Sequence, residues 1–216
     1  FTFVNGLARN RIVRLNTDGT VDTSFDAGSG FSDSVQEIGV QPDGRVVAVG
    51  HFTSVNGVNR NRIARLNSDG SVDDTFNPGG GANNPILDML VQPDGRTVIV
   101  GDFSSFNGVS RKGVARINSD GTLDETFGLG DGPDFSVHAV VMQRDGRVII
   151  AGDFKNYDGV ACEGVVRLNP DGSIDKSFNS ALGFDDSVRC IALQEDGRIV
   201  IGGFFGHVGN VARGRI

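Results

Sequence analysis

Residues 41 to 76 read QPDGRVVAVGHFTSVNGVNRNRIARLNSDGSVDDTF, and this stretch recurs along the chain with constant spacing. Its Asp-Gly-Arg turn, its Arg-(Leu/Ile)-Asn triplet and its closing phenylalanine each return every 51 residues. The copies of the Asp-Gly-Arg turn begin at Asp43, Asp94, Asp145 and Asp196. A fixed period of about 50 residues, without insertions, predicts a repeat architecture.

One repeat has the composition of four short β-strands joined by tight turns. Asp43-Gly44 and Asp69-Gly70 supply turns with a left-handed glycine, and Asn56-Gly57 is a further turn signal. The segments between the turns are rich in β-branched residues and lack helical spacing. The expected strands are residues 35–41, 46–52, 62–67 and 72–76. This pattern predicts an all-β fold, a β-propeller built of four-stranded antiparallel blades.

The period divides the 216 residues into a single propeller array of about four repeats. The expected parts are a partial blade at 1–33, blades at 34–84, 85–135 and 136–186, and a partial blade at 187–216. The two partial blades can complete one another and close a four-bladed ring. Alternatively, the chain is a sector of a larger propeller. We favour the sector, because residues 205–216 repeat the register of residues 1–12 and a closed ring has no place for both.

The composition limits the classes of partner. With 38% hydrophobic residues, a chain of this length can bury a core without disulfide staples. The formal net charge of −7, a pI of about 4.9 and the absence of Lys or Arg runs argue against nucleic acid and anionic membrane surfaces. Membrane insertion is not expected, because the sequence lacks an apolar stretch of 18 residues. Cys162 and Cys190 are expected to be buried thiols, with a disulfide between them as the alternative.

Each repeat carries Asn-x-Asp-Gly-x-x-Asp, which resembles part of the calcium loop of integrin-type propellers. The oxygen-bearing side chains that could bind calcium are Asn16, Asp18, Asp22, Asn67, Asp69, Asp73, Asn118, Asp120, Asp124, Asn169, Asp171 and Asp175. The first ligand position of that loop is instead filled by Arg14, Arg65, Arg116 and Arg167. A guanidinium there can pair with the aspartates. The sequence therefore favours a metal-free turn held by arginine, with calcium as the alternative.

The loops between blades vary in composition and are rich in glycine, carboxylates and amides. Variable loops on a repeated scaffold are where binding usually resides. Their candidate ligand-binding residues are Asp26, Asp33, Asn83, Asn84, Asp131, Asp134, Asp185 and Asp186. We expect these residues to form a solvated acidic surface, with a site for a cation or for sugar hydroxyls as the alternative. The three histidines occupy different repeat positions, and no role is expected for His51, His138 and His207.

The unit Q-P-D-G-R-hhhhG-x-F-xxx-N-G, where h is apolar, continues to A-R-L-N-x-D-G-S-h-D-xx-F. It resembles the delta-60 repeat of large bacterial secreted and surface proteins, and the resemblance covers the whole chain. The departures are mild: Asp158 replaces the turn asparagine, and Gly209-Asn210 inverts the Asn-Gly pair. The resemblance implies a β-propeller in a secreted or cell-surface bacterial protein, commonly beside other domains. It implies no catalytic residues.

The uniformity of the repeats predicts a non-catalytic module, a binding or structural scaffold without a cofactor. Catalysis requires a few unlike groups that converge once, whereas evenly repeated residues serve the blade itself or form several equal sites. The expected partners are a protein or a glycan, together with neighbouring blades or domains of a longer chain. One alternative is a multivalent lectin or adhesin with one weak site per blade. A second is a sector of a propeller enzyme.

Overall fold

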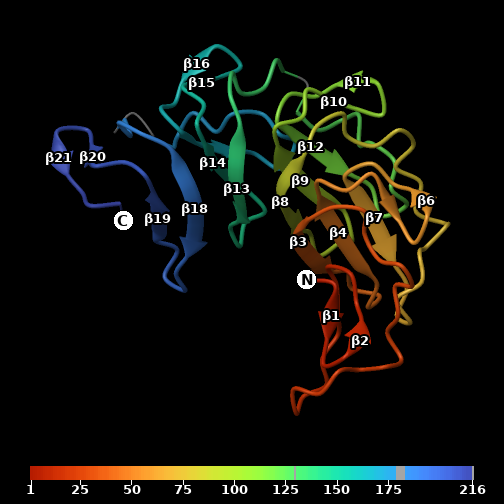
Figure 1. Ribbon diagram of the computed structural model, residues 1–216. Helices are drawn as coiled ribbons and strands as arrows, with labels where there is room; N and C mark the ends of the chain where they lie inside the picture. Colours follow the sequence, from red (N-terminus) through yellow and green to blue (C-terminus); the bar gives the residue numbers. More distant parts are fainter. Residues whose placement is uncertain (129, 179–182, 216) are drawn as a thin grey trace.

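The computed structural model describes residues 1–128, 130–178 and 183–215, and every regular element in them is a β-strand (Figure 1). The strands recur with the period of the sequence. The second unit contains β3 (Val35–Val40), β4 (Val46–Gly50), β5 (Ser54–Val55), β6 (Val58–Asn59) and β7 (Ile63–Leu66). The third contains β8 (Ile86–Val91), β9 (Thr97–Gly101), β10 (Ser105–Phe106), β11 (Val109–Ser110) and β12 (Val114–Ile117).

The remaining strands follow the same plan. The fourth unit contains β13 (Val137–Met142), β14 (Val148–Gly152), β15 (Asn156–Tyr157), β16 (Val160–Ala161) and β17 (Val165–Leu168). The first residues form β1 (Phe3–Val4) and β2 (Leu7–Ala8), and the last form β18 (Val188–Leu193), β19 (Ile199–Gly203), β20 (His207–Val208) and β21 (Val211–Ala212). Each complete unit therefore holds a three-stranded antiparallel sheet and a separate two-stranded hairpin. The predicted all-β propeller fold is confirmed.

The fourth strand of each blade is shorter than the sequence predicts. In the sheet β3-β4-β7 it is a single bridge between Leu66 and Val72. One residue later, the Asp73 carboxylate accepts hydrogen bonds from the backbone N–H and the hydroxyl of Thr75, at 2.9 and 2.7 Å. This local turn ends the strand, because it directs the backbone away from the ladder.

The first strand of each sheet carries a β-bulge close to its beginning. The register shifts between Val35 and Glu37 in β3, and the same shift occurs in β8, β13 and β18. The residues that fall out of register are Gln36, Leu87, His138 and Arg189. A bulge redirects a side chain and is common beside functional sites.

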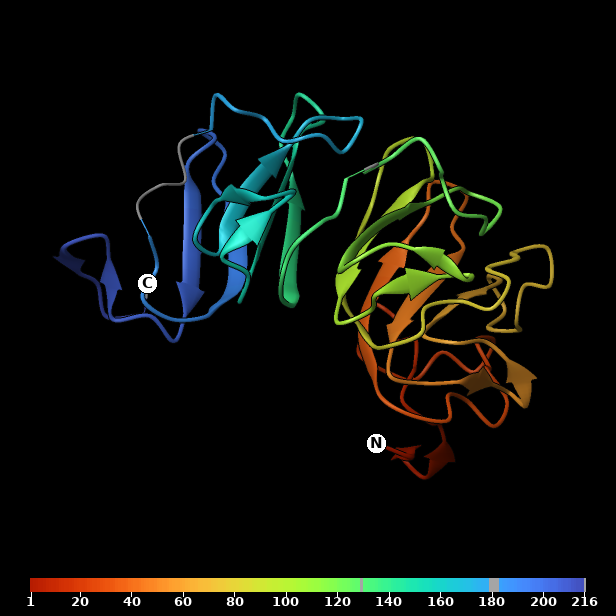
Figure 2. The ribbon, with the colours of Figure 1, turned by 90° about the horizontal axis from the view of Figure 1, so that it is seen from above.

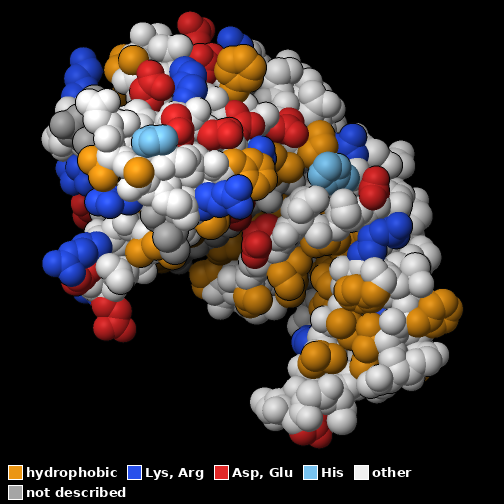
Figure 3. Space-filling model, turned by 60° about the vertical axis from the view of Figure 1, so that its left-hand side comes forward, with side chains coloured by type: hydrophobic (Ala, Val, Ile, Leu, Met, Phe, Trp, Pro, Cys, Tyr) orange, Lys and Arg blue, Asp and Glu red, His pale blue; other side chains and the backbone are white. Residues whose placement is uncertain are grey.

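The sheets pack side by side into an open arc (Figure 2). Their first strands are neighbours, with β3 against β8, β8 against β13 and β13 against β18. The hairpins β1–β2 and β20–β21 lie at the two ends of the arc and do not meet (Figure 1). The surface is hollowed on the concave side of the arc, where apolar side chains gather, and side chains of both charges lie above them (Figure 3).

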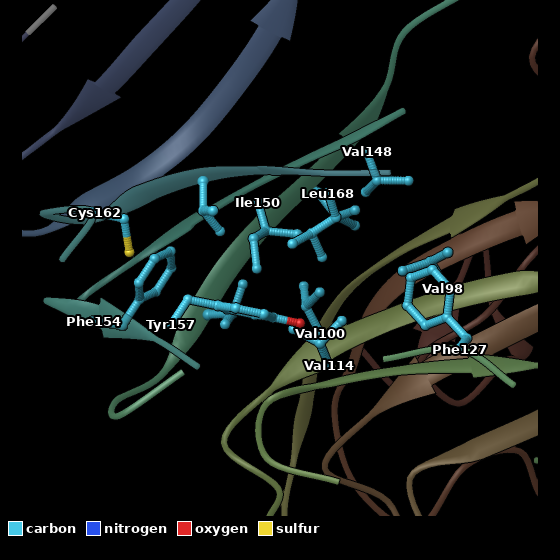
Figure 4. Close-up of a cluster of buried hydrophobic side chains, with 13 residues drawn as sticks. Val98, Val100, Val114, Phe127, Val148, Ile150, Phe154, Tyr157, Cys162 and Leu168 are labelled. Carbon is cyan, nitrogen blue, oxygen red and sulfur yellow. The ribbon is translucent and has the colours of Figure 1, made fainter. Parts of the chain in front are cut away.

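The core lies between successive sheets. In Figure 4, Val98, Val100 and Val114 of one sheet face Ile150 and Leu168 of the next, and all five belong to one buried cluster. Repeated phenylalanines close these layers: Phe25, Phe52, Phe76, Phe103, Phe127, Phe154 and Phe205 are at most 2% exposed, and Phe178 is partly buried. Burying each ring contributes up to about 3 kcal/mol.

Both cysteines are free thiols, and only one of them is buried. Cys162 packs into the core cluster beside Tyr157, and burial raises the pKa of its thiol to about 12. Cys190 lies on β18 and is exposed, so the expectation of a buried thiol is wrong there. Among the described residues, its strand has another sheet on one side only, which leaves Cys190 uncovered.

The described residues contain no helix with the length and apolar character that a membrane span requires.

Candidate functional site

An arginine in each repeat binds an aspartate of its own blade, and in three copies, Arg14, Arg65 and Arg116, it also donates to a carbonyl of the next blade. Arg116 Nε lies 2.8 Å from Asp124 Oδ2, and its guanidinium stacks 4.4 Å from the centre of the Phe127 ring. Its Nη1 donates to the carbonyl of Pro170 in the following blade at 2.6 Å. Arg14, Arg65 and Arg167 make the same Nε bond within their own repeats, at 2.8, 2.7 and 2.8 Å. We call this the arginine clamp.

The side chains that could bind calcium take part in the clamp or in the turn beside it. Asp120 Oδ1 accepts from the backbone N–H of Thr122 at 3.0 Å and from its hydroxyl at 2.7 Å. Asn118 Nδ2 donates to the same hydroxyl at 3.0 Å. Asp124 instead faces Arg116 and Thr126. The described residues hold no group of three or more His, Cys, Asp and Glu side chains that could bind a metal.

The acidity of these carboxyls follows from their partners. Burial opposes ionisation of Asp124, but the hydroxyl and backbone N–H of Thr126 and the Arg116 guanidinium outweigh it and lower the pKa of Asp124 to about 2. The Ser177 hydroxyl and N–H, with Arg167, lower the pKa of Asp175 to about 2. Both carboxylates are therefore ionised at neutral pH and have partners within the chain.

The eight candidate loop residues do not form one rim. The loop 26–33 begins beside the Asp-Gly turn of the next blade, where the Asp26 N–H donates to the Asp69 carbonyl at 2.8 Å. It ends at Asp33, directly before β3, where Oδ1 accepts from the Ser34 N–H at 2.6 Å. Asp186 accepts in the same way from Ser187, at 2.7 Å. Asn84 and Asp131 are exposed.

Three of the eight residues cap the outer hairpins. Asp134 Oδ1 accepts from the consecutive backbone N–H groups of Lys155 and Asn156, at 2.8 and 3.1 Å. Asn83 and Asp185 occupy the same repeat position. Asn83 accepts from the backbone N–H groups of residues 104 and 105, and Asp185 accepts from those of residues 206 and 207. The hydrogen bond from the backbone N–H of His207 is the main reason that the pKa of Asp185 is lowered to about 2. Part of the loop 179–186, residues 179–182, lies outside the described residues.

The end of the arc's concave surface where the first strands begin differs from one repeat to the next. Four repeat positions lie there: the bulge residue, the residue that follows the second strand, and the two residues that precede the first strand. We call them the mouth positions. They hold Gln36, Leu87, His138 and Arg189; His51, Asp102, Asp153 and Phe204; Ser34, Pro85, Ser136 and Ser187; and Asp33, Asn84, Phe135 and Asp186. The backbone repeats at these positions, but the side-chain chemistry does not.

Where the third and fourth copies of the mouth positions meet, unlike groups converge. His138 Nε2 lies 2.8 Å from Asp153 Oδ2 and 2.7 Å from Arg189 Nη1. The Ser187 hydroxyl donates to Asp153 Oδ1, and the Arg189 guanidinium stacks 5.0 Å from the centre of the Phe204 ring. A single imidazole nitrogen donates to the carboxylate or accepts from the guanidinium, so His138 satisfies one of these two partners at a time. This mouth cluster joins two neighbouring blades.

Two aromatic rings at the mouth positions face solvent. Phe135 is 66% exposed and Phe204 is 61% exposed, in contrast to the buried repeated phenylalanines. Exposed aromatics beside arginine are typical of protein interfaces. The sequence pattern did not predict these exposed rings, and no role was expected for His138. A comparison of the repeats position by position would have found them, because Phe135 stands where the other copies have Asp33, Asn84 and Asp186.

The sequence matches one protein family. The model described as "Domain of unknown function (DUF5122) beta-propeller" matches residues 1–25, 41–76, 92–127, 143–178 and 194–216. The segments between these matches contain the blade-to-blade loops and the first strands. A comparison with curated proteins found no match.

Solved structures share the fold at low sequence identity. The extracellular domain of the one-component system BT4673 of B. thetaiotaomicron is 13% identical, with a TM-score of 0.50 over 79% of this chain and 22% of that one. The same protein, described as a hybrid two-component system, gives 12% identity and a TM-score of 0.52 over 89% and 25%. PorZ, a surface component of the type-IX secretion system of Porphyromonas gingivalis, is 14% identical over 86% and 27%, with a TM-score of 0.47. The chain therefore spans about a quarter of the length of these structures.

Proposed function

We propose that this chain, which belongs to the DUF5122 β-propeller family, is a non-catalytic binding module that holds a protein partner at its mouth positions. The observation that carries the proposal is the contrast between the repeated turns and the mouth. In the turns, the repeated arginines and aspartates bind one another. At the mouth, the same backbone presents different side chains, two of them exposed phenylalanines. Aromatic and arginine side chains dominate the binding energy of protein interfaces.

The contacts of the mouth cluster differ from those of a Ser-His-Asp hydrolase. The Ser187 hydroxyl donates to the Asp153 carboxylate, whereas in such a triad the histidine lies between the serine oxygen and the carboxylate. His138 faces Asp153 and Arg189. These contacts support a binding role over a catalytic one.

The arrangement also favours one composite site over a lectin with equal sites in every blade. Equal sites require the same side chains in each repeat, and no two copies hold the same combination of residues at the four mouth positions. The amide and carboxyl oxygens of Asn83, Asp134 and Asp185, which do share a repeat position, accept backbone hydrogen bonds. They are therefore part of the scaffold.

We place the module in a longer secreted or cell-surface bacterial protein. The delta-60 resemblance supports this location. Both solved structures of BT4673 are of its extracellular domain, and this chain spans 22% and 25% of them. Because their identity is 13% and 12%, this likeness supports the fold more strongly than the location.

The test is a screen of the folded chain against peptide and glycan libraries, repeated with two triple variants. The mouth variant combines Phe135→Asn, Arg189→Ala and Phe204→Asn. The control variant combines Arg144→Ala, Glu195→Gln and Arg198→Ala, which are exposed beside the Asp-Gly-Arg turns and change the net charge equally.

We expect peptides that bind the wild type and the control variant but not the mouth variant. Ligands that bind all three proteins equally contradict the proposal. Glycans that depend on the mouth positions would replace the protein partner with a sugar. Circular dichroism spectra of both variants establish that they are folded.

A further inference from the structure

A pocket of about 250 Å³ lies beside the mouth cluster, at the junction between the units 85–135 and 136–186. Its lining includes Asp102, Phe103, Lys112, Pro133, Phe135 and Ser136. Asp102 and Phe135 are exposed. The pocket therefore offers a carboxylate and an aromatic face within one depression of the surface.

The next junction along the chain shows which group a carboxylate and an aromatic ring can bind together. There, Asp153 occupies the repeat position of Asp102, and Ser187 that of Ser136. The guanidinium of Arg189 lies between Asp153 Oδ1, 3.9 Å from Nη2, and the Phe204 ring. The chain's own arginine thus fills the space between a carboxylate and an aromatic ring.

At the junction of Asp102 this arginine is replaced. The equivalent residue is His138, whose Nε2 contacts Asp153 of its own blade. Within the part of the chain that the structure describes, no Lys, Arg or His nitrogen lies within 4.0 Å of the Asp102 carboxylate. The aromatic ring comes from another repeat position, Phe135, but lines the same pocket as Asp102.

We propose that the pocket of Asp102 and Phe135 binds a guanidinium or ammonium group on a basic side chain of the protein partner. This inference rests on the proposed function and names the chemistry of one contact in it. A carboxylate and a ring face together recognise such a cation, because the carboxylate pairs with its charge and the ring attracts it through its quadrupole. The net charge of −7 adds a long-range attraction for basic partners.

Among the described residues that line the pocket, Lys112 alone is basic, and its charge limits the affinity for a second cation. Its ammonium repels a second cation, and its long side chain can move toward solvent. Lys112→Gln is therefore expected to strengthen binding of the basic group. This variant gives the proposal an expected gain as well as an expected loss.

The experiment is a titration of the ¹⁵N-labelled chain with N-acetyl-arginine amide, followed by amide chemical shifts. N-acetyl-citrulline amide is the neutral isostere and serves as the control ligand. We expect the arginine probe to shift the amides of Asp102, Ser104 and Ser136, and citrulline to bind about tenfold more weakly. Asp102→Asn and Phe135→Leu should each abolish the difference between the two probes.

The matched control is Asp131→Asn, which removes an exposed carboxylate from the same loop as Phe135 and outside the pocket. It should leave the arginine titration unchanged. Arg189→Ala should create a second site for the arginine probe, reported by the amides of Asp153 and Phe204. Equal binding of arginine and citrulline, or an equal effect of Asp131→Asn and Asp102→Asn, overturns the inference.

The two proposals can fail separately. If peptides bind through the mouth positions but show no preference for basic residues and no sensitivity to Asp102→Asn, the proposed function stands and the cation pocket is wrong. If the arginine probe binds at Asp102 but no peptide depends on the mouth positions, the pocket stands and the proposed function is wrong.

Discussion

Arg116 Nη1 lies 2.6 Å from the carbonyl oxygen of Pro170, in the Asp-Gly turn of the next blade. The same guanidinium binds Asp124 of its own blade, and both side chains are at least 92% buried, with exposures of 5% and 8%. Arg116 therefore stabilises the turn of its own repeat and also contacts the next repeat. Its removal should weaken the junction between the two blades.

Arg116→Ala should lower the free energy of unfolding by about 3 kcal/mol, because it leaves the buried Asp124 without its main cation. This is the low end of the range for a broken buried pair, since Arg96 Nη1 also lies 3.2 Å from Asp124. Urea denaturation followed by circular dichroism measures the loss. The control is Arg198→Ala, whose side chain is 81% exposed, and it should cost less than about 1 kcal/mol. Equal midpoints for the two variants would contradict the clamp.

Gly121→Ala should be more destabilising than Gly44→Ala. Both glycines have a left-handed φ, +93° and +83°, so alanine costs about 1 kcal/mol at each through the backbone alone. At Gly121 the added Cβ would also lie 2.6 Å from the backbone nitrogen of Asn77 in the preceding blade, whereas at Gly44 nothing lies within 4 Å. We expect about 1 to 3 kcal/mol more for Gly121→Ala, measured by urea denaturation. Identical losses would show that the blades can separate there without cost.

Asp134→Ala should cost about 1 kcal/mol, and Asp134→Asn should cost less, because asparagine loses only the acceptor of the Asn156 side-chain amide. Asparagine retains the oxygen that accepts from Lys155 and Asn156, and Asn83 makes the equivalent bonds one repeat earlier. Hydrogen exchange of these two amides is the measurement. If both variants lose protection equally, the charge of Asp134 and not its acceptor oxygen holds the hairpin.

The chain should lose stability as the pH falls from about 4 to about 2. The pKa of Asp124 and of Asp175 is lowered to about 2 in the folded chain, from an ordinary value of 3.8. The unfolded chain then takes up protons first, so stability is complete above pH 4 and declines through this window. Asp88 acts in the opposite direction, because burial raises its pKa. Denaturation midpoints across this pH range at constant ionic strength test the prediction, and a flat profile would contradict it.

Iodoacetamide at pH 8 should modify one cysteine per folded chain. Cys190 is exposed, whereas the Cys162 thiol is buried and its pKa is raised to about 12, which leaves little thiolate. Intact mass spectrometry counts the adducts, and Cys190→Ser should remove the single adduct. Modification of both cysteines before unfolding would mean that the junction around Tyr157 opens.

Local chemistry made much of the fold predictable. The Asp43 carboxylate accepts from the N–H of Arg45 two residues later, at 3.0 Å, and Gly44 has a φ of +83°. Such turns depend only on neighbouring residues, so their repetition revealed the strands between them. The sequence also placed Arg65 against Asp73, because both residues recur together in every turn. The fourth strand was predicted too long, since the bond from Thr75 to Asp73 competes with the ladder.

The sequence by itself determined the repeat, the blade and the arginine turn, because each rests on contacts within one unit. Only the tertiary structure decided which side chains meet at the mouth. His138 and Arg189 are 51 residues apart, and each stands alone at its position in its own repeat. They come together because bulges in β13 and β18 turn both toward the same space when the two sheets pack. Packing between blades brings residues that differ between the copies together on one surface. The contact between His138 and Arg189 therefore cannot be predicted from a single repeat.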